Sequence, residues 1–358
     1  MSLEELLQVV VTTSKTEESV LESPGVIEII TAQDIAAYGA LSLGEVLDRS
    51  TSVMSVGSSV FPNNNMAVRG DVSLVDKHVL LLIDGRPFRE SATGGQNFTI
   101  YASYPLAMVD RIEIVRGPGS VLYGTNAYSG IINIIPKRGK RLEAEAVARY
   151  GSFETAQSSV AAGGVLKDLQ VFAAAQYLNR RGRRLNTIDA FGVLNSTRAR
   201  ELDIGVAGDV RYKGLSLNLL YAGSAQQSLV NQIAGPFAPL VGDRVFADLG
   251  YTRQFGRRWS ASLNITHNYN QSSLPVRPVP DFLSGNNPSL RINSRDALAE
   301  LSVSGELTKG LRLLVGGVAD YQTGGSENPE AFPPPEQGAD VITSLTPPYH
   351  WIWWSGYG

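Results

Sequence analysis

The chain has 358 residues, enough for about two or three domains of ordinary size, and charged residues make up 18% of it, below the roughly 25% usual in soluble proteins. The net charge of -3 gives no argument for a nucleic-acid partner, and the lack of any run of about 18 apolar residues excludes transmembrane helices but not a transmembrane β-barrel. The absence of cysteine excludes disulfide scaffolds, cysteine–zinc sites and thiol catalysis, and the three histidines lie too far apart to suggest a metal site.

The N-terminal segment, residues 1–22, lacks the basic start, apolar core and small-residue cleavage site of a secretory signal. We therefore expect that the start was trimmed or lost, or that the protein stays inside the cell. Residues 8–12 read Gln-Val-Val-Val-Thr. Such a β-branched segment can add as a strand to the sheet edge of another protein. The alternative is an ordinary first strand of the domain that follows.

Residues 23–140 indicate a mixed α/β domain. Thr31 to Asp34 is typical of a capped helix start, and Gly39 is a natural stop. Ser42 to Glu45 repeats the start signal for a second helix that ends near Asp48. Short apolar runs bounded by Gly, Pro or Asp predict strands at 26–30, 66–70, 79–83, 111–115 and 131–135.

Residues 141–323 change to a period of two, with apolar and polar side chains alternating. We count about nine such strands, starting near 142, 157, 169, 200, 215, 243, 259, 295 and 311. Tight turns alternate with long polar segments, and aromatic residues gather near the strand ends. Short turns on one side and long loops on the other predict antiparallel strands of an outer-membrane barrel. Residues 324–358 are expected to be a loop and an irregular, exposed tail.

A soluble β-sandwich or propeller with one wet face is the alternative interpretation of this pattern. The predicted strands are about 10–14 residues long, whereas strands of soluble proteins usually have about 5–6. Strand length therefore favours the membrane barrel.

Three segments of the first domain carry a family resemblance. Residues 66–70 read Met-Ala-Val-Arg-Gly, residues 79–87 contain Ile-Asp-Gly, and residues 109–138 contain Arg-Ile-Glu-Ile-Val-Arg-Gly-Pro-Gly-Ser-Val-Leu-Tyr-Gly and Gly-Ile-Ile-Asn-Ile-Ile. They resemble the plug domain of TonB-dependent outer-membrane receptors, of the siderophore and cobalamin type. The resemblance covers about residues 8–140 and implies an α+β plug followed by antiparallel transmembrane β-barrel strands in a Gram-negative outer membrane. The barrel itself is supported by its alternation only.

The resemblance implies roles for several plug residues. Arg69 and Arg116 match arginines that join plug and barrel wall, and a guanidinium suits this because it stays charged and forms bidentate pairs. Alone, both could be solvated strand ends. The segment Gln8, Val9, Val10, Val11 and Thr12 matches the TonB box, although Gln8 fits that pattern only roughly. The implied partners are TonB, energised by ExbB and ExbD, together with outer-membrane lipid and lipopolysaccharide.

The resemblance also implies that apical plug loops and long outer loops hold a bulky ligand. Amides and aromatics suit such a ligand, and an arginine cluster could attract an anionic ferric chelate. The arginines could equally meet lipopolysaccharide phosphates or be solvated. A ferric siderophore comes first, cobalamin second, and sugars or other metals remain open. The candidate residues are Phe61, Asn63, Asn64, Asn65, Arg89, Phe98, Tyr101, Arg180, Arg181, Arg183 and Arg184.

The number of strands departs from the family, whose large plugged barrels have 22 strands. About nine strands leave an open edge, and each unpaired backbone group in lipid costs several kcal/mol. We therefore expect a truncated, frameshifted or partner-completed receptor that does not transport as it stands. A soluble enzyme or binding protein is the remaining class, but no nucleophile–base pair, phosphate loop or metal cluster supports an enzyme, and no cofactor is expected.

Overall fold

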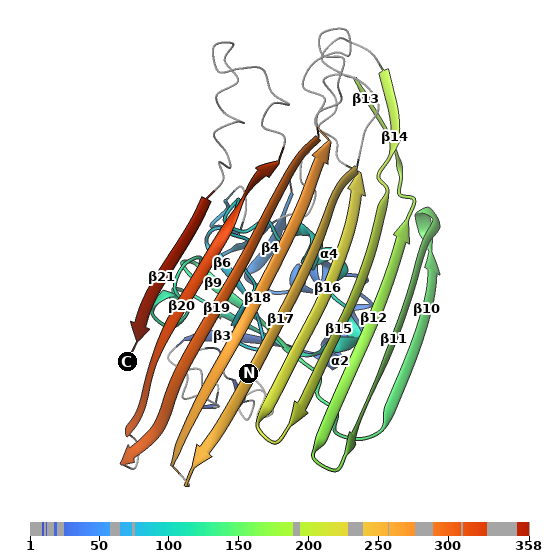
Figure 1. Cartoon of the computed structure of the whole chain (residues 1–358). Coiled ribbons are helices and arrows are strands. Elements are labelled where there is room, and N and C mark those ends of the chain that lie inside the picture. Colours follow the sequence, from blue (N-terminus) through green and yellow to red (C-terminus); the bar gives the residue numbers. More distant parts are fainter. Residues whose placement is uncertain are drawn as a thin grey trace, which may run out of the picture.

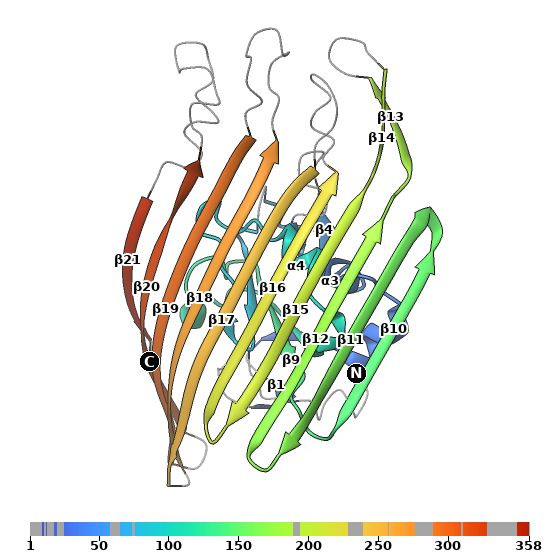
Figure 2. The same ribbon diagram turned by 45° about the vertical axis from the view of Figure 1, so that its right-hand side comes forward.

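The structure is a computed structural model that describes residues 9–10, 12, 18–19, 25–57, 65–73, 76–188, 194–227, 239–256, 258–275, 289–308, 311–327 and 349–357. A long curved sheet stands along one side of a smaller α/β domain, the plug (Figure 1). Seen from a second direction, the plug lies against the concave face of this sheet (Figure 2). Within these residues no helix has the length and apolarity needed to cross a membrane.

The plug is built on a five-stranded sheet of order β3-β8-β9-β6-β7. Only the β6–β9 pair is parallel. The predicted β-branched runs form its centre, and Ile112, Ile114, Ile132 and Ile134 are fully buried there. The strands are β3 (Val26–Thr31), β6 (Val79–Ile83), β7 (Arg86–Pro87), β8 (Val109–Arg116) and β9 (Gly130–Pro136).

Both predicted helix starts are present in the plug. The Thr31 side chain accepts from the Asp34 N–H and completes a capping box, and Gly39 ends the helix at φ 64°. The Ser42 side chain accepts from the Glu45 N–H at the second helix. The helices are α2 (Ala32–Tyr38), α3 (Leu43–Leu47), α4 (Phe98–Ser103), α5 (Ser120–Tyr123) and the 3-10 helix η1 (Leu106–Met108).

Two small antiparallel pairs complete the plug. One joins β4 (Val53–Val56) to β5 (Asn65–Val68), and the other joins β1 (Val9–Val10) to β2 (Glu18–Ser19). Helix α4 was not predicted. It occupies the segment that we expected to be an exposed apical loop, and all six of its residues are buried.

The second part is a ten-stranded antiparallel sheet, here called the barrel wall, in which each strand pairs with the next. Its open edges among the described strands are β10 and β21. The long predicted loop after β12 extends as a hairpin of β13 (Arg184–Ile188) and β14 (Leu194–Arg198), and the 3-10 helix η2 (Ser152–Glu154) joins β10 to β11. The wall strands are β10 (Glu143–Gly151), β11 (Thr155–Leu166), β12 (Leu169–Arg180), β15 (Glu201–Tyr212), β16 (Leu215–Gln227), β17 (Pro239–Phe255), β18 (Trp259–Pro275), β19 (Ser289–Thr308), β20 (Leu311–Glu327) and β21 (Tyr349–Tyr357).

The two faces of the wall differ as the alternation predicts. On β18, Thr266 and Asn268 are buried against the plug side, whereas Leu263 and Ile265 are about half exposed on the other face. The apolar side chains of the wall are thus not sandwiched between two protein layers. An apolar outer face and a polar inner face are typical of barrel strands in an outer membrane.

The predicted irregular tail differs from the structure. Residues Tyr349–Tyr357 form β21, which pairs with β20 from Gly324↔Tyr349 to Gly316↔Tyr357 and raises the strand number from the nine expected to ten. The run of tryptophans hid an alternation, because aromatic residues stand on both faces of this strand.

Candidate functional site

Ion pairs join the plug to the barrel wall directly after strand β6. Arg86 pairs with Glu300 of β19, and Arg89 pairs with Asp320 of β20. The two carboxylate side chains are only 4% and 6% exposed. Removing one partner of a buried pair leaves an uncompensated charge and costs about 3–5 kcal/mol. These pairs therefore hold the plug on the inner face of the wall.

Asp84 makes a third contact of this kind from the turn between β6 and β7. Asp84 and Gly85 take positive φ angles of 50° and 76°, which turns the carboxylate away from the strand. It lies 2.5 Å from Arg211 of β15 and 3.1 Å from Arg138. Burial acts to raise the pKa of Asp84, but the two guanidinium groups outweigh it and lower that pKa. The carboxylate is therefore held in its charged form.

The two arginines predicted to join plug and wall are placed differently. Arg116 pairs with Glu28 and donates to the Thr51 hydroxyl at 2.7 Å, both within the plug. Burial tends to raise the pKa of Glu28, but hydrogen bonds from Ser50 and Arg116 lower it overall. Arg69 is exposed at a positive φ of 55°. Neither meets a wall carboxylate in the described part of the chain, so their role as a latch stays a prediction.

A buried polar network links the plug to β17. Asp76 accepts hydrogen bonds from the Tyr101 hydroxyl at 2.5 Å and the Asn97 amide at 3.0 Å. Arg244 of β17 donates to the Asn97 oxygen at 2.7 Å and stacks 4.5 Å from the centre of the Phe88 ring. Burial raises the pKa of Asp76 to about 7. One wall arginine thus enters the plug and is held by an amide and an aromatic face.

This network fixes two of the predicted ligand residues inside the plug. Tyr101 is 1% exposed and bonded to Asp76, and Phe98 is 1% exposed. Asn65 is also buried and donates to the Ser73 carbonyl at 2.7 Å. These three side chains serve the core rather than the surface. Phe61, Asn63 and Asn64 lie outside the described residues.

The end of the predicted TonB box is tied to the plug core. The Thr12 N–H and hydroxyl donate to Glu113 at 3.1 and 2.5 Å, and Asn133 donates to the Thr12 oxygen at 2.9 Å. Glu113 and Asn133 are 0% exposed and lie on the central strands β8 and β9. Val9 and Val10 pair with Ser19 and Glu18. Both expectations for this segment therefore keep support: a short strand forms, and it attaches to the plug at one residue.

The arginines of the first long loop gather at the end of the wall where the long loops emerge. Arg180 pairs with Glu45 of the plug and Glu201 of β15, whereas Arg181 pairs with Glu154. Arg183 and Arg184 are exposed. A cavity of about 310 Å³ is lined there by Arg180, Arg183, Arg200 and Glu201. With three guanidinium groups and one carboxylate, its lining carries a net positive charge.

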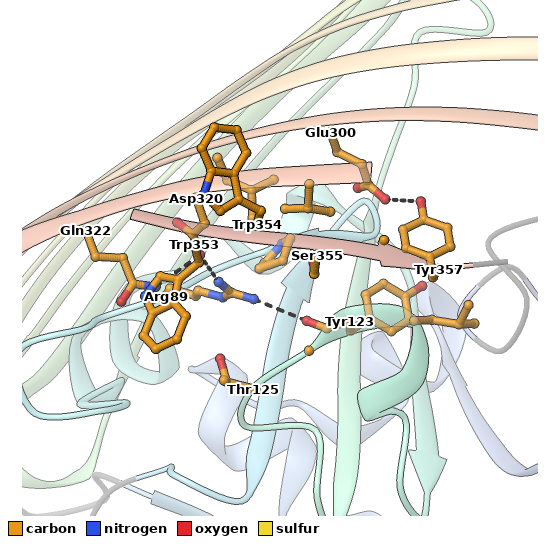
Figure 3. A pocket seen from close by; sticks show the side chains of 16 residues that line it. Arg89, Tyr123, Thr125, Glu300, Asp320, Gln322, Trp353, Trp354, Ser355 and Tyr357 are labelled. Carbon is orange, nitrogen blue, oxygen red and sulfur yellow. Dashed lines mark hydrogen bonds and ion pairs between the residues drawn. The ribbon is translucent and has the colours of Figure 1, made fainter. Parts of the chain in front are cut away.

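A second cavity, of about 410 Å³, lies between the plug and strands β19 to β21. Arg89 spans its floor, bonded to Asp320 on one side and to the Tyr123 carbonyl at 3.2 Å on the other (Figure 3). Arg89 is the predicted ligand residue that the structure brings to this cavity. No group of three His, Asp or Glu side chains suited to a metal ion occurs among the residues that the structure describes.

Sequence reasoning missed Asp84, Arg86, Asp76 and Arg244. Asp84 and Arg86 had been interpreted only as part of a turn after a strand. Arg244 carried one usable signal, because a charged residue on the inward register of an alternating strand faces either water or a buried partner. Its partners lie more than 140 residues away, as the separation of 147 from Asn97 shows.

The comparisons with known proteins agree with this architecture. Residues 19–131 match the family described as TonB-dependent Receptor Plug Domain. The vitamin B12 transporter BtuB of Vibrio cholerae is 38% identical over 157 residues, which cover 43% of this chain and 25% of the transporter. BtuB of Photobacterium profundum is 33% identical over 126 residues, covering 35% of this chain and 20% of that protein.

Solved structures share the fold at low sequence identity. The pyoverdine outer-membrane receptor FpvA of Pseudomonas aeruginosa has a TM-score of 0.66 at 15% identity, covering 89% of this chain and 49% of the receptor. A ferric enterobactin receptor, PfeA of the same organism, has a TM-score of 0.65 at 19% identity, covering 89% of this chain and 51% of the receptor.

Plug, barrel wall and matched motifs together define a receptor of the outer membrane of Gram-negative bacteria. The chain belongs to the TonB-dependent receptors, a family of non-enzymatic transport proteins, and consists of their plug domain with part of their barrel. The match spans about a quarter of the length of the vitamin B12 transporters and about half that of the solved receptors.

Proposed function

We propose that the chain acts in the energy-coupled uptake of a scarce, bulky ligand, with TonB as the partner that supplies the pull. The observation that carries this is the attachment of the β-branched N-terminal segment to the centre of the plug. Its last residue, Thr12, is bonded to Glu113 and Asn133 on two central strands. A strand added to the partner's sheet edge would be held by main-chain hydrogen bonds. Force on the segment would then reach the plug core directly.

A ferric siderophore is the first ligand class. The cavity lined by Arg180, Arg183 and Arg200 supports it, because a net positive lining draws an anionic chelate toward the outer end of the wall. The solved receptors with this fold include proteins named for pyoverdine and ferric enterobactin. Lipopolysaccharide phosphate is the competing anion at the same arginines.

Cobalamin is the second ligand class, and a different observation favours it. The relatives that share 38% and 33% identity over the plug are named as vitamin B12 transporters. The two classes differ in charge, so the arginine cavity separates them. Replacing Arg183 and Arg200 by Gln would weaken the binding of an anionic ferric chelate and leave cobalamin binding unchanged.

The uptake function is tested with Val9→Pro and the matched control Val9→Ile. Proline removes the N–H that a strand pairing needs, whereas isoleucine keeps strand propensity. Cells that produce the chain are given radiolabelled ferric enterobactin or cyanocobalamin, and surface binding is measured apart from accumulation. We expect Val9→Pro to keep binding and lose accumulation, and Val9→Ile to behave as the unmodified chain. Accumulation that survives Val9→Pro would refute the coupling. Binding without accumulation in the unmodified chain would favour a non-transporting receptor fragment.

A further inference from the structure

Two tryptophans of β21 stand on the inner face of the wall without being covered by the plug. Trp353 is opposite Asp320 and Trp351 is opposite Gln322 in the β20–β21 register, and directly opposed residues share a face. Asp320 is bonded to Arg89 of the plug, so this face is the inner one. Trp351 and Trp353 are each 56% exposed.

Their exposure sets them apart from other inward-facing aromatic residues on the described wall. Phe172 of β12 and Phe246 of β17 are 3% and 0% exposed, because the plug packs over them. The indole rings of Trp351 and Trp353 lie 6.2 Å apart between centres and are tilted by 30°. Two large apolar rings are thus presented side by side toward the lumen, where the wall is otherwise polar.

The cavity beside them has a floor whose charges are already paired. Arg89 is paired with Asp320, and Arg86 is paired with Glu300, which also accepts a hydrogen bond from Tyr357. Trp353, Gln322 and Thr125 line the same cavity of about 410 Å³ (Figure 3). A ligand there would meet aromatic faces, an amide and a hydroxyl rather than a free charge.

We propose that Trp351 and Trp353 form an aromatic platform that takes the flat conjugated ring system of the ligand, with its polar edge toward Gln322 and Thr125. Stacked aromatic pairs combine a large buried area with a favourable ring geometry, which suits a planar ring more than a flexible chain. This platform rests on the proposed uptake function, and it names the part of the ligand that the inner wall recognises. It lies apart from the arginine cavity, which attracts by charge.

The test uses the full chain in detergent and equilibrium dialysis with three probes. Cyanocobalamin and ferric enterobactin carry flat conjugated rings, and ferrioxamine B is a ferric chelate without any ring. The variants are the double substitution Trp351→Ala with Trp353→Ala, the milder Trp353→Phe, and Trp354→Ala as the matched control. Trp354 lies on the same strand but opposite Ala319 on the outer face, where it is 82% exposed. Heat-modifiable mobility on gels checks that each variant is folded.

We expect at least one ring-bearing probe to bind, and the double variant to weaken that binding by roughly tenfold or more. Trp353→Phe should weaken it less, and Trp354→Ala should leave it unchanged. Equal binding by the double variant, an equal loss in Trp354→Ala, or no binding of either ring-bearing probe would overturn the platform. Binding of ferrioxamine B alone would also overturn it and leave the uptake function standing. Tryptophan-dependent binding without TonB-dependent accumulation would instead support the platform and refute the uptake function.

Discussion

At the scale of single residues, the plug is held to the wall by charged groups that are paired out of water. Asp84, Arg86 and Arg89 follow one strand of the plug and reach three different wall strands. Arg244 makes the reverse contact, from the wall into the plug. Because each partner is buried, the loss of one group leaves a charge or a donor without compensation. These residues therefore set how firmly the plug sits.

Asp76 makes plug stability depend on pH. Burial raises its pKa from 3.8 to about 7, so the folded state binds a proton that the unfolded state releases. Its contribution is full below about pH 4 and is lost as the pH rises to about 7, by up to about 4 kcal/mol. The lowered pKa values of Asp84 and Glu28 act in the opposite direction, but below pH 4. We expect Asp76→Asn to flatten the decline between pH 4 and 7.

The measurement uses the absence of cysteine from the chain. A cysteine placed at Ala127, which is 1% exposed in the plug, reports unfolding in urea through its reaction with a pyridyl disulfide. Asp110→Asn is the control, since that carboxylate is 40% exposed on β8. It should keep the decline of the unmodified chain. An equally steep decline in Asp76→Asn would show that another group causes the pH dependence.

At the scale of elements, helix α4 is the piece of the plug that touches the wall most closely. The Ser103 hydroxyl donates to the Gly223 carbonyl of β16 at 2.8 Å. A Cβ at Gly205 of β15 would lie 1.8 Å from the Ser103 carbonyl oxygen, and one at Gly242 of β17 would lie 2.4 Å from the Thr99 hydroxyl. Two wall glycines thus provide the space in which α4 lies.

Gly205→Ala tests this close approach. The added methyl cannot fit without moving α4, so we expect the free energy of unfolding to fall by about 1–3 kcal/mol, as overpacking usually costs. Gly208→Ala on the same strand is the matched control, because its Cβ would meet its nearest neighbour, the Phe172 carbonyl oxygen, at 3.8 Å. Thermal unfolding in detergent measures both. Equal effects of the two substitutions would contradict the contact between α4 and the wall.

Much of the element list could be predicted from local signals. The capping residues Thr31 and Ser42 and the alternation over 141–323 were sufficient for two helices and nine wall strands. Helix α4 gave no such signal, because it has six residues and its N-cap Asn97 makes no side-chain capping bond. Strand β21 was hidden by tryptophans on both faces. Contacts such as Arg86–Glu300, 214 residues apart, follow from the closure of plug on wall, which no local pattern encodes.

At the scale of the whole molecule, the account depends on the barrel wall separating lipid from the plug. The described strands present apolar side chains outward and polar or plug-covered side chains inward, and the ion pairs, the arginine cavity and the tryptophan platform all lie on the inner side. A wall with water on both faces would remove the reason for this division. Each proposed site depends on this orientation.

The most direct test is the accessibility of spin labels on β18 of the full chain in lipid bilayers. Single cysteines at Leu263, Ile265 and His267 mark the outer face, and those at Asn264, Thr266 and Asn268 mark the inner face. We predict that oxygen dissolved in lipid reaches the first three labels far better than a water-soluble nickel chelate does, and that the other three show no such preference for oxygen. Equal accessibility along the strand, or a preference on the inner face, would contradict the assignment of this chain to a plugged barrel wall.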